Sequence, residues 1–261
     1  MKTALLISTY NWPQALELIF KSIFEQTEMP DEVLIADDGS TEETKNLIDN
    51  FIKKSTFKVL HVWQEDKGFR KAIILNKAVA KSSCDYIIQI DGDCIMHPKF
   101  IADHKENAQK NVYLYGTRAT ITKEALPRIF DEQKTKFNFF SPNLKKKSRT
   151  IHNKLLSKMY KPHEGFSSNF RGCNVSFWRE DFIAINGYNE DFEGWGREDS
   201  DLVIRLGNKG VLAKRLRYVG IVYHIYHTEN SRDQLQENDL IQHKSIQNKI
   251  IRTEKGISQY L

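Results

Sequence analysis

The first 117 residues alternate short apolar segments with amphipathic ones, and this alternation constrains the fold more than any other feature of the sequence. Strands that alternate with helices build a mostly parallel sheet with helices on both faces. The pattern predicts strands at Ala4–Ser8, Glu32–Ala36, Lys58–Val62, Tyr86–Ile90 and Val112–Tyr115. We therefore predict an α/β protein with a Rossmann-like central sheet.

The segment between the first two strands is the clearest predicted helix. Asn11 is a candidate cap for it and Pro13 fits its first turn. Its apolar residues recur at the i, i+3, i+4, i+7 and i+8 spacing of a helix face, namely Leu16, Ile19, Phe20, Ile23 and Phe24. Further helices are predicted at Thr41–Phe51, Phe69–Lys81 and Pro98–Asn111.

The alternation stops between Arg118 and Glu164, where the chain is polar and basic. Irregular segments of this length inside a domain are usually functional or mobile, so we expect a partly helical flap. Regular structure is predicted again at Gly172–Trp178 and Gly220–Tyr226 (strands), Arg179–Ile185 and Glu198–Lys209 (helices), and in a helical tail from Thr228. We expect one domain with a half at 1–117, a second half at 118–227 and a tail at 228–261.

Size and composition are those of an ordinary globular protein. With 261 residues, 40% of them hydrophobic, the chain can bury a substantial core. No apolar run approaches the ~20 residues that span a bilayer, and the start "MKTALLIST" lacks the features of a signal peptide. The three cysteines match neither a disulfide framework nor a zinc site. We therefore expect a cytoplasmic protein.

The charge is modest, at +5, but it is concentrated in places such as "NLKKKSR" at residues 143–149. Such a run is usually a solvated loop. The alternative interpretation is that it contacts anionic phospholipid or a phosphorylated substrate. Peripheral association with a membrane stays open on this ground. We expect no nucleic-acid partner.

The stretch "IIQIDGDCIMHP" ends a predicted buried strand with two acids, Asp91 and Asp93. Alternation along a strand places residues i and i+2 on one face, so both carboxylates are expected to point to one spot. In an open parallel sheet, ligands bind beyond the carboxyl ends of the strands. A divalent cation between these acids and the phosphates of a ligand would relieve the repulsion between like charges.

Three other predicted strand ends are polar, with the sequences "STYN", "DDGS" and "EDKGFR". Together they can recognise a nucleotide: Tyr10 stacks on a base, Asp38 accepts a hydrogen bond from a base N–H, and Arg70 binds phosphate. Neither a GxGxxG fingerprint nor a P-loop is present. Taken alone, "DDGS" is more typical of a turn with a helix cap.

The stretch "YNEDFEGWGREDSDLVIRL" places Glu198, Asp199 and Asp201 at the start of a helix, where the dipole stabilises carboxylates. Trp195 between two glycines precedes them, and such a ring can pack on a sugar face. The alternative is a charged, well-capped first turn. In "VYHIYH", strand alternation puts His224 and His227 on opposite faces, so only one of them is expected to join a given site.

The ordered set of motifs resembles glycosyltransferase family 2, with the GT-A fold, over nearly the whole chain. The motifs are "ISTYN", "PDEVLIADDGS", "KGFRKAIILNKA", "DYIIQIDGD", "RGCNVSFWREDFIAINGYNEDFEGWGREDSDLVIRL" and "YH". The second half is similar to domains of the chondroitin-polymerase type and to the "WGGED" region of beta-1,4-galactosyltransferases. The resemblance implies a sheet that binds the nucleotide sugar and a C-terminal half that binds the acceptor.

The resemblance also implies roles for particular residues. The nucleotide site would comprise Thr9, Tyr10, Asn11, Asp38, Gly68, Arg70 and Asp91, and the metal ligands would be Asp91, Asp93 and His224. Asp199 matches the general base, with Glu198 beside it, and the acceptor would contact Gly172, Asn174, Trp195, Gly196 and Arg197. Two positions depart from the family: Arg197 replaces the second glycine of "WGGED", and Leu75 stands where many relatives have arginine.

The implied activity is metal-dependent, inverting transfer of a hexosyl or N-acetylhexosaminyl group from a UDP-sugar to a hydroxyl of a glycan or glycolipid. Two carboxylates and an imidazole favour Mn²⁺ over Mg²⁺. By analogy, the product would be a bacterial surface polysaccharide or lipopolysaccharide made at the inner face of the membrane. The alternatives are a metal-dependent nucleotidyltransferase or sugar-nucleotide hydrolase, and a non-catalytic carbohydrate-binding module.

Overall fold

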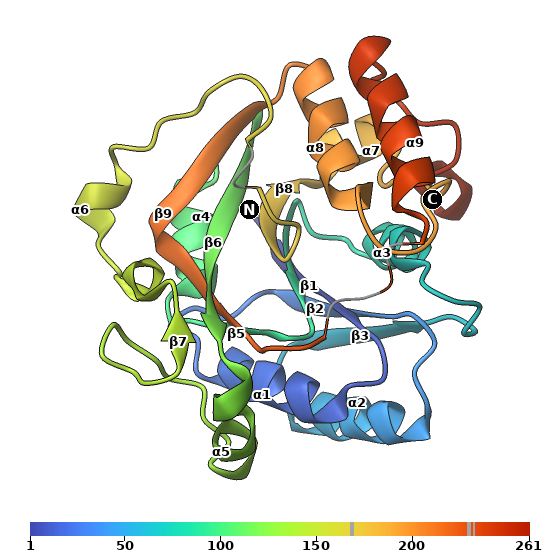
Figure 1. Cartoon of the computed structure of the whole chain (residues 1–261). Helices are drawn as coiled ribbons and strands as arrows, with labels where there is room; N and C mark the ends of the chain where they lie inside the picture. Colours follow the sequence, from blue (N-terminus) through green and yellow to red (C-terminus); the bar gives the residue numbers. More distant parts are fainter. Residues whose placement is uncertain (168–169, 229–230, 232) are drawn as a thin grey trace.

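A computed structural model of the chain describes residues 1–167, 170–228, 231 and 233–261 (Figure 1). These residues form a nine-stranded sheet in the order β3-β2-β1-β4-β8-β6-β9-β5, and β7 pairs with β6. The strands are β1 (Thr3–Thr9), β2 (Glu32–Asp37), β3 (Lys58–Trp63), β4 (Tyr86–Asp91), β5 (Cys94–Met96), β6 (Val112–Ile121), β7 (Leu144–Lys145), β8 (Asn174–Trp178) and β9 (Leu212–His224). β3, β2, β1 and β4 are mutually parallel, whereas β8 runs antiparallel to both β4 and β6.

Helices cover both faces of this sheet, as the alternating pattern predicts. Figure 1 shows α1 and α2 on one face, and α3, α7, α8 and α9 on the other. The helices are α1 (Pro13–Phe24), α2 (Glu42–Lys54), α3 (Lys71–Ala80), α4 (Phe100–Asn107), α5 (Leu126–Asp131), α6 (Lys154–Ser157), α7 (Arg179–Ala184), α8 (Glu198–Asn208) and α9 (Leu235–Gln247). The apolar stripe of α1 packs with Val33 and Ile35 of β2, and Leu75 of α3 packs on the other face with Leu34.

The predicted strands and helices of the first half are all present, with small differences at their ends. β6 and β9 are longer than predicted, because they run on to Ile121 and begin at Leu212. Arginine and lysine side chains on these strands break the apolar alternation on which the prediction depended. β5, a three-residue strand that pairs with β9, was not predicted.

Asn11 does not cap α1, contrary to the sequence-based expectation. Its backbone lies in the left-handed region at φ 42°, and Trp12 is the residue before the helix. The Asn11 carboxamide oxygen accepts a hydrogen bond from Thr41 N at 2.8 Å, and Asn11 N donates to Ser40 Oγ at 2.9 Å. Asn11 therefore joins the loops that follow β1 and β2, next to the predicted nucleotide rim.

The segment from residue 118 to 164 contains short elements only, after β6 ends. They are α5, β7, α6, and 3₁₀ turns at Lys123–Ala125 and Lys147–Thr150. His152 Nε2 lies 3.0 Å from Asp103 Oδ1 of α4, and Asn153 N donates to Tyr218 O, so this segment is anchored to the sheet. In the tail, α9 is followed by a 3₁₀ turn at Ile257–Tyr260. Among the described residues, no helix combines the length and apolarity needed to cross a bilayer.

Candidate active site

The loops after β1, β2 and β3 are held together by buried hydrogen bonds around Asp38. Its Oδ1 accepts from Gln64 Nε2 at 2.6 Å, and its Oδ2 accepts from the Arg70 backbone N at 2.7 Å. Burial raises the pKa of the Asp38 carboxyl, although these two donors oppose the effect. The acid that the sequence assigns to base recognition is thus oriented before any ligand arrives.

Tyr10 lies at the outer rim of these loops and is 52% exposed. Its hydroxyl donates to Asp66 Oδ2 at 2.7 Å, while Asp66 Oδ1 accepts from Gly68 N at 3.1 Å. Gly39 allows the loops to approach this closely, because a Cβ there would lie 2.6 Å from the backbone of Asp66. The ring of Tyr10 is therefore positioned at the surface, where a base could stack on it.

Asp91 and Asp93 have different partners, although strand alternation predicted that both carboxylates point to one spot. β4 ends at Asp91, and the alternation of a strand does not continue through the turn that follows. Asp91 Oδ1 accepts from Ser8 Oγ at 2.9 Å and lies 2.9 Å from Lys71 Nζ. Asp93 instead faces two histidines.

His224 and His227 both reach Asp93, which corrects the expectation that they lie on opposite faces. Their Nε2 atoms lie 3.4 Å and 3.2 Å from Asp93 Oδ2. β9 ends at His224, so the chain after it is free to bring His227 back to the same side. Burial would raise the pKa of Asp93, but the neighbouring histidines lower it to about 2.

The donor atoms of Asp93, His224 and His227 all lie within 4.8 Å of one another. One carboxylate and two imidazoles form a mixed oxygen and nitrogen ligand set, which suits transition metals better than Mg²⁺. The residues therefore fit a divalent cation. His227 was not among the ligands that the sequence predicted, while Asp91, which was among them, lies outside this group of three.

Lys71, the first residue of α3, lies at the centre of the site. Its Nζ is 2.9 Å from Asp91 Oδ1, 3.3 Å from Asp199 Oδ2 and 3.9 Å from Glu198 Oε1. Burial alone would lower the pKa of this amine, but the three acids raise it well above its ordinary value. Sequence reasoning missed Lys71; its only signal is its place directly after Arg70.

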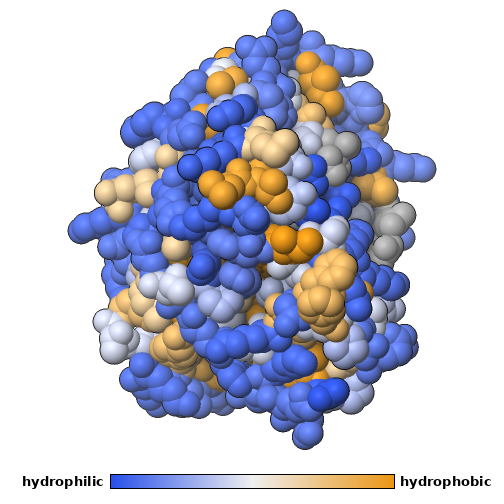
Figure 2. Space-filling model, turned by 90° about the vertical axis from the view of Figure 1, so that its left-hand side faces the viewer, coloured by the Kyte–Doolittle hydropathy of each residue, from blue (hydrophilic) through white to orange (hydrophobic). Residues whose placement is uncertain are grey.

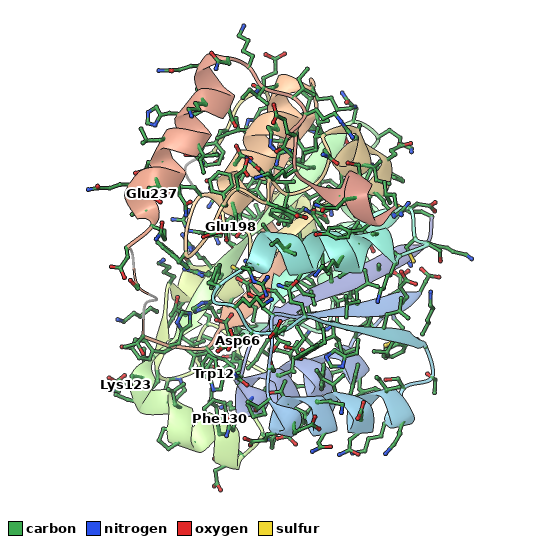
Figure 3. The ribbon with its side chains drawn as sticks, turned by 90° about the vertical axis from the view of Figure 1, so that its right-hand side faces the viewer. Trp12, Asp66, Lys123, Phe130, Glu198 and Glu237 are labelled. Carbon is green, nitrogen blue, oxygen red and sulfur yellow. The ribbon has the colours of Figure 1, made fainter. Side chains whose placement is uncertain are left out.

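Asp199 and Glu198 begin α8 and lie side by side over Lys71. Asp199 Oδ1 lies 3.0 Å from the hydroxyl of Tyr188, which is also bonded to Gln89. Glu198 is only 6% exposed, and burial together with the charge of Asp199 raises its pKa to about 7. Figure 3 labels Glu198, at the start of α8, and Asp66, in the loop after β3.

Of the other predicted acceptor contacts, Gly172 lies against Asp199 and Asn174 lies in the core. A Cβ at Gly172 would be 1.8 Å from Asp199 Oδ2, so only glycine leaves room for this carboxylate. Asn174 is 1% exposed, and its Nδ2 donates to Gly220 O at 2.7 Å. Contrary to expectation, Asn174 joins β8 to β9 and does not line the surface of the site.

Trp195 and Gly196 lie directly before α8, and Trp195 is 38% exposed. Arg197 has a φ of 78°, in the left-handed region that glycine adopts at no cost. Its Nε lies 2.5 Å from Asp239 Oδ1 of α9, so the guanidinium is directed to that helix. Leu75, at the second departure from the family pattern, is fully buried in the core.

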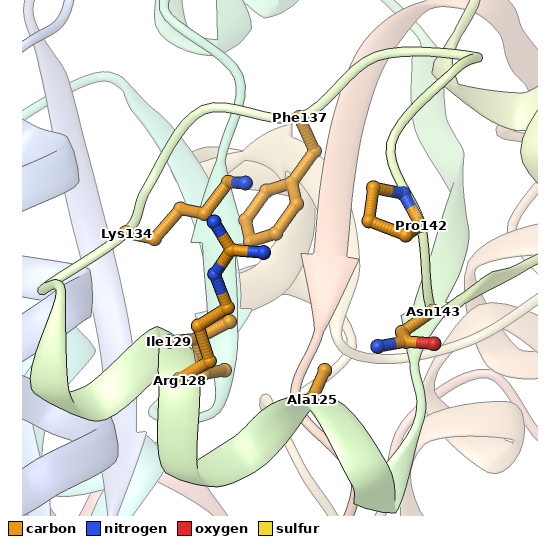
Figure 4. A pocket seen from close by; sticks show the side chains of 7 residues that line it. All are labelled: Ala125, Arg128, Ile129, Lys134, Phe137, Pro142 and Asn143. Atoms are coloured by element: carbon orange, nitrogen blue, oxygen red, sulfur yellow. The ribbon is translucent and has the colours of Figure 1, made fainter.

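A separate hollow beside α5 is too small to hold a nucleotide sugar. It has a volume of about 30 Å³ and is lined by Ala125, Arg128, Ile129, Lys134, Phe137, Pro142 and Asn143 (Figure 4). That volume is enough for about one water molecule. This hollow is therefore not the candidate site, which is the surface formed by the strand-end loops and the start of α8.

Comparison of the sequence with known families gives two matches. The model described as glycosyl transferase family 2 matches residues 4–170, and the model described as the N-terminal domain of galactosyltransferase matches residues 153–228. Validoxylamine A glucosyltransferase of Streptomyces hygroscopicus subsp. limoneus is 27% identical over 230 residues, which are 80% of this chain and 48% of the relative. Chondroitin synthase of Escherichia coli is 25% identical over 224 residues, which are 79% of this chain and 32% of the relative. The chain thus spans about half of these relatives, or less.

Solved structures similar to this chain share its fold. A mannosyltransferase from Pyrobaculum calidifontis, in complex with GDP-Man and Mn²⁺, has a TM-score of 0.61 at 19% identity over 98% of this chain and 65% of its own. Residues 1–349 of TarS from S. aureus, in complex with UDP, have a TM-score of 0.64 at 14% sequence identity. The match covers 100% of this chain and 68% of the TarS chain. These likenesses confirm the predicted GT-A fold.

Proposed function

Because this chain belongs to glycosyl transferase family 2, we propose that it transfers a sugar from a UDP-sugar to a hydroxyl of a glycan or glycolipid acceptor. The observation that carries the proposal is the contact of Asp199 with Lys71 and Tyr188. Lys71 also contacts Asp91, whose charge acts on His224 of the group formed by Asp93 and its two histidines. A candidate base and a candidate cation site therefore flank one surface. We assign residues 1–117 to donor binding, 118–227 to the acceptor and catalysis, and 228–261 to a supporting tail.

The donor nucleotide would bind at the ends of β1, β2 and β4. Tyr10 offers a ring for the base, Asp38 an oriented acceptor, and Asp91 a carboxylate near the ribose. Thr9, Asn11 and Gly68 shape this rim, and Arg70 supplies a cation for phosphate. The hydrogen bonds among these loops support the assignment, because they orient the side chains before the ligand binds.

The divalent cation would be held by Asp93, His224 and His227, and this ligand set favours Mn²⁺ over Mg²⁺. When bound there, such an ion supplies Lewis-acid stabilisation of the charge on the departing diphosphate. Asp93 is pre-oriented for this role by its contacts with the two imidazoles. Asp91 would act next to it, held in place by Ser8 and Lys71.

Asp199 would accept the proton of the acceptor hydroxyl as that oxygen attacks the anomeric carbon opposite to UDP, which inverts the configuration there. Base assistance of this kind contributes ~10²–10⁴-fold to the rate. Lys71 and Tyr188 both contact this carboxylate and would orient it. Glu198, Trp195, Gly196 and Arg197 would form the acceptor surface, and Gly172 leaves room for Asp199.

The biological setting that we propose is bacterial surface polysaccharide or lipopolysaccharide synthesis in the cytoplasm, at the inner face of the membrane. The basic segment around residue 146 supports a peripheral contact with anionic lipid.

The deciding experiment measures UDP release from a panel of UDP-sugars, with and without Mn²⁺ and with glycan acceptors. Acceptor-dependent UDP release that needs the metal supports the proposal. Release of pyrophosphate would indicate a nucleotidyltransferase, and UDP-sugar cleavage that no acceptor stimulates would indicate a hydrolase. No turnover, with retained glycan binding, would indicate a carbohydrate-binding module.

A further inference from the structure

Residues 133–163 contain nine lysines and arginines and no aspartate or glutamate. The 3₁₀ turn at Lys147–Thr150 in this segment packs against both β6 and β9, which carry further arginines on the same side of the fold. Figure 2 looks at the side of the molecule where α6 lies, and its surface there is mostly hydrophilic with separate hydrophobic islands. The segment 133–163 therefore concentrates positive charge well above the chain average.

The basic cluster, as we name it, consists of Arg118, Lys146, Arg149, Arg171, Arg215 and Arg217. Arg149 lies at its centre: its Nη1 donates to Arg118 O at 3.1 Å. The pKa of Arg149 is lowered by burial and then by the charges of Arg215, Arg217, Arg171 and Arg118. The cations are therefore close enough to repel one another.

In the described part of the chain, no ion pair joins Arg118, Lys146, Arg149, Arg215 or Arg217 to an acidic side chain. Some cations outside the basic cluster are paired, as Lys154 is with Glu106 and Lys209 with Asp181. Two donors of the basic cluster, Arg215 Nε and Arg217 Nη1, are buried and have no hydrogen-bond partner among the described residues. Buried donors without partners are costly, and an anionic ligand would supply the partners that these two donors need.

The basic cluster begins beside the proposed reaction centre. Arg171 precedes Gly172, which lies against Asp199, and Arg118 Nη1 donates to Cys173 Sγ at 3.7 Å. From there the cluster follows β6 and β9, whereas the proposed nucleotide rim follows β1, β2 and β3 on the other side of β4. The ligand of the basic cluster would therefore lie on the β6 and β9 side of the site, where the charge of Arg118 also acts on His224 and His227.

We propose that the basic cluster binds a phosphate group carried by the sugar acceptor, a proposal that rests on the glycosyltransferase function above. Guanidinium groups bind phosphate through paired N–H donors, which matches a site dominated by arginine. Space is available nearby: Lys145, next to Lys146, lines a hollow of about 250 Å³ together with Thr120, Glu124 and Tyr226. The phosphate belongs either to a soluble phosphorylated glycan or to a lipid-linked acceptor at a membrane surface.

The test compares the wild type with the double variant Arg149→Gln/Arg217→Gln. The first probe is tripolyphosphate with EDTA, which removes any divalent ion that would draw phosphate to Asp93. The second probe is vesicles of phosphatidylcholine with and without phosphatidylglycerol. Vesicles are included because two apolar side chains beside the cluster, Leu155 and Met159, are 76% and 74% exposed. Lys53→Gln/Lys54→Gln on α2 removes the same charge from exposed positions elsewhere and serves as the control.

We expect the double variant to lose ~10–100-fold in phosphate affinity, since two charge-assisted contacts are removed, while the control keeps wild-type affinity. If the double variant loses affinity for tripolyphosphate but not for anionic vesicles, the phosphate belongs to a soluble glycan. If it loses affinity for anionic vesicles, whether or not it also loses affinity for tripolyphosphate, the phosphate belongs to a lipid. Wild-type binding of both probes by the double variant, or an equal loss in the control, overturns the proposal. UDP binding with Mn²⁺, measured on the same proteins, tests the proposed function separately, because the double variant should retain it.

Discussion

The ammonium group of Lys71 lies 3.3 Å from the carboxylate oxygen Oδ2 of Asp199, although 128 positions separate the two residues along the chain. The same amine lies 2.9 Å from Asp91 Oδ1. The positions of Lys71 and Asp91 in the sequence do not predict this contact. Three acids thus share one buried cation, and the charge balance of the site depends on it.

Lys71→Met should lower the free energy of unfolding at pH 8 by about 3–5 kcal/mol, because it leaves buried carboxylates without their partner. The loss should be smaller at pH 5, since burial raises the pKa of Glu198 to about 7 and this carboxyl is then protonated without the cation. Urea denaturation at both pH values measures this. Lys81→Met, at the exposed end of α3, is the control and should change stability by less than ~0.5 kcal/mol. An equal loss at both pH values would contradict the electrostatic role.

Asp199→Asn should reduce sugar transfer by ~10²–10⁴-fold, because the amide cannot accept the acceptor proton. UDP affinity should stay close to that of the wild type, since Asp199 is not part of the proposed donor rim. Turnover assays and calorimetric titration with UDP and Mn²⁺ measure the two quantities. Glu237→Gln on the exposed side of α9 should affect neither. A parallel loss of UDP binding would refute the assignment of Asp199 as the base.

His227→Ala and Asp93→Ala should each weaken metal-dependent UDP binding by about tenfold or more, because each removes a proposed ligand of the cation. His224→Ala should behave in the same way. Titration with Mn²⁺ followed by electron paramagnetic resonance reports metal binding directly. His243→Ala, a histidine on the exposed part of α9, is the matched control. Unchanged Mn²⁺ affinity in His227→Ala would exclude that residue from the site.

Glu198 should make the protein less stable as the pH rises from about 4.5 to about 7. Its pKa is raised from 4.5 to about 7 in the fold, so the folded state holds the proton more tightly than the unfolded chain does. The free energy of unfolding should fall over this range by about 3 kcal/mol relative to Glu198→Gln, which cannot titrate. Denaturation curves of both proteins between pH 4 and pH 8 provide the measurement. Parallel pH profiles would show that Glu198 does not titrate in this range.

Gly172→Ala should reduce transfer by ~100-fold, because the new methyl group overlaps the Asp199 carboxylate and a displacement of about 1 Å is enough for such a loss. Gly207→Ala within α8 meets no atom within 4 Å and should instead stabilise the protein by ~0.5–1 kcal/mol. Turnover and thermal melting of the two variants make the comparison. Full activity in Gly172→Ala would mean that Asp199 does not act from its present position.

The layers of the fold could be predicted because they depend on patterns within about ten residues. The stripe from Leu16 to Ile23 is apolar at helical spacing, and it is buried in the structure. β5 and the extensions of β6 and β9 were missed because three residues carry too little pattern and because Arg118 and Arg215 interrupt the apolar alternation. Local sequence therefore predicted the elements better than their ends.

The candidate site was predictable only in its outline. Motifs at strand ends indicate which residue types gather there, since the carboxyl ends of parallel strands meet at one edge of the sheet. Whether two side chains touch depends instead on how the chain turns after each strand. After the turn that follows β4, Asp91 contacts Lys71 and Asp93 contacts the histidines, and the turn after β9 returns His227 to Asp93. The tertiary path alone decided these contacts and the position of Lys71 among the acids.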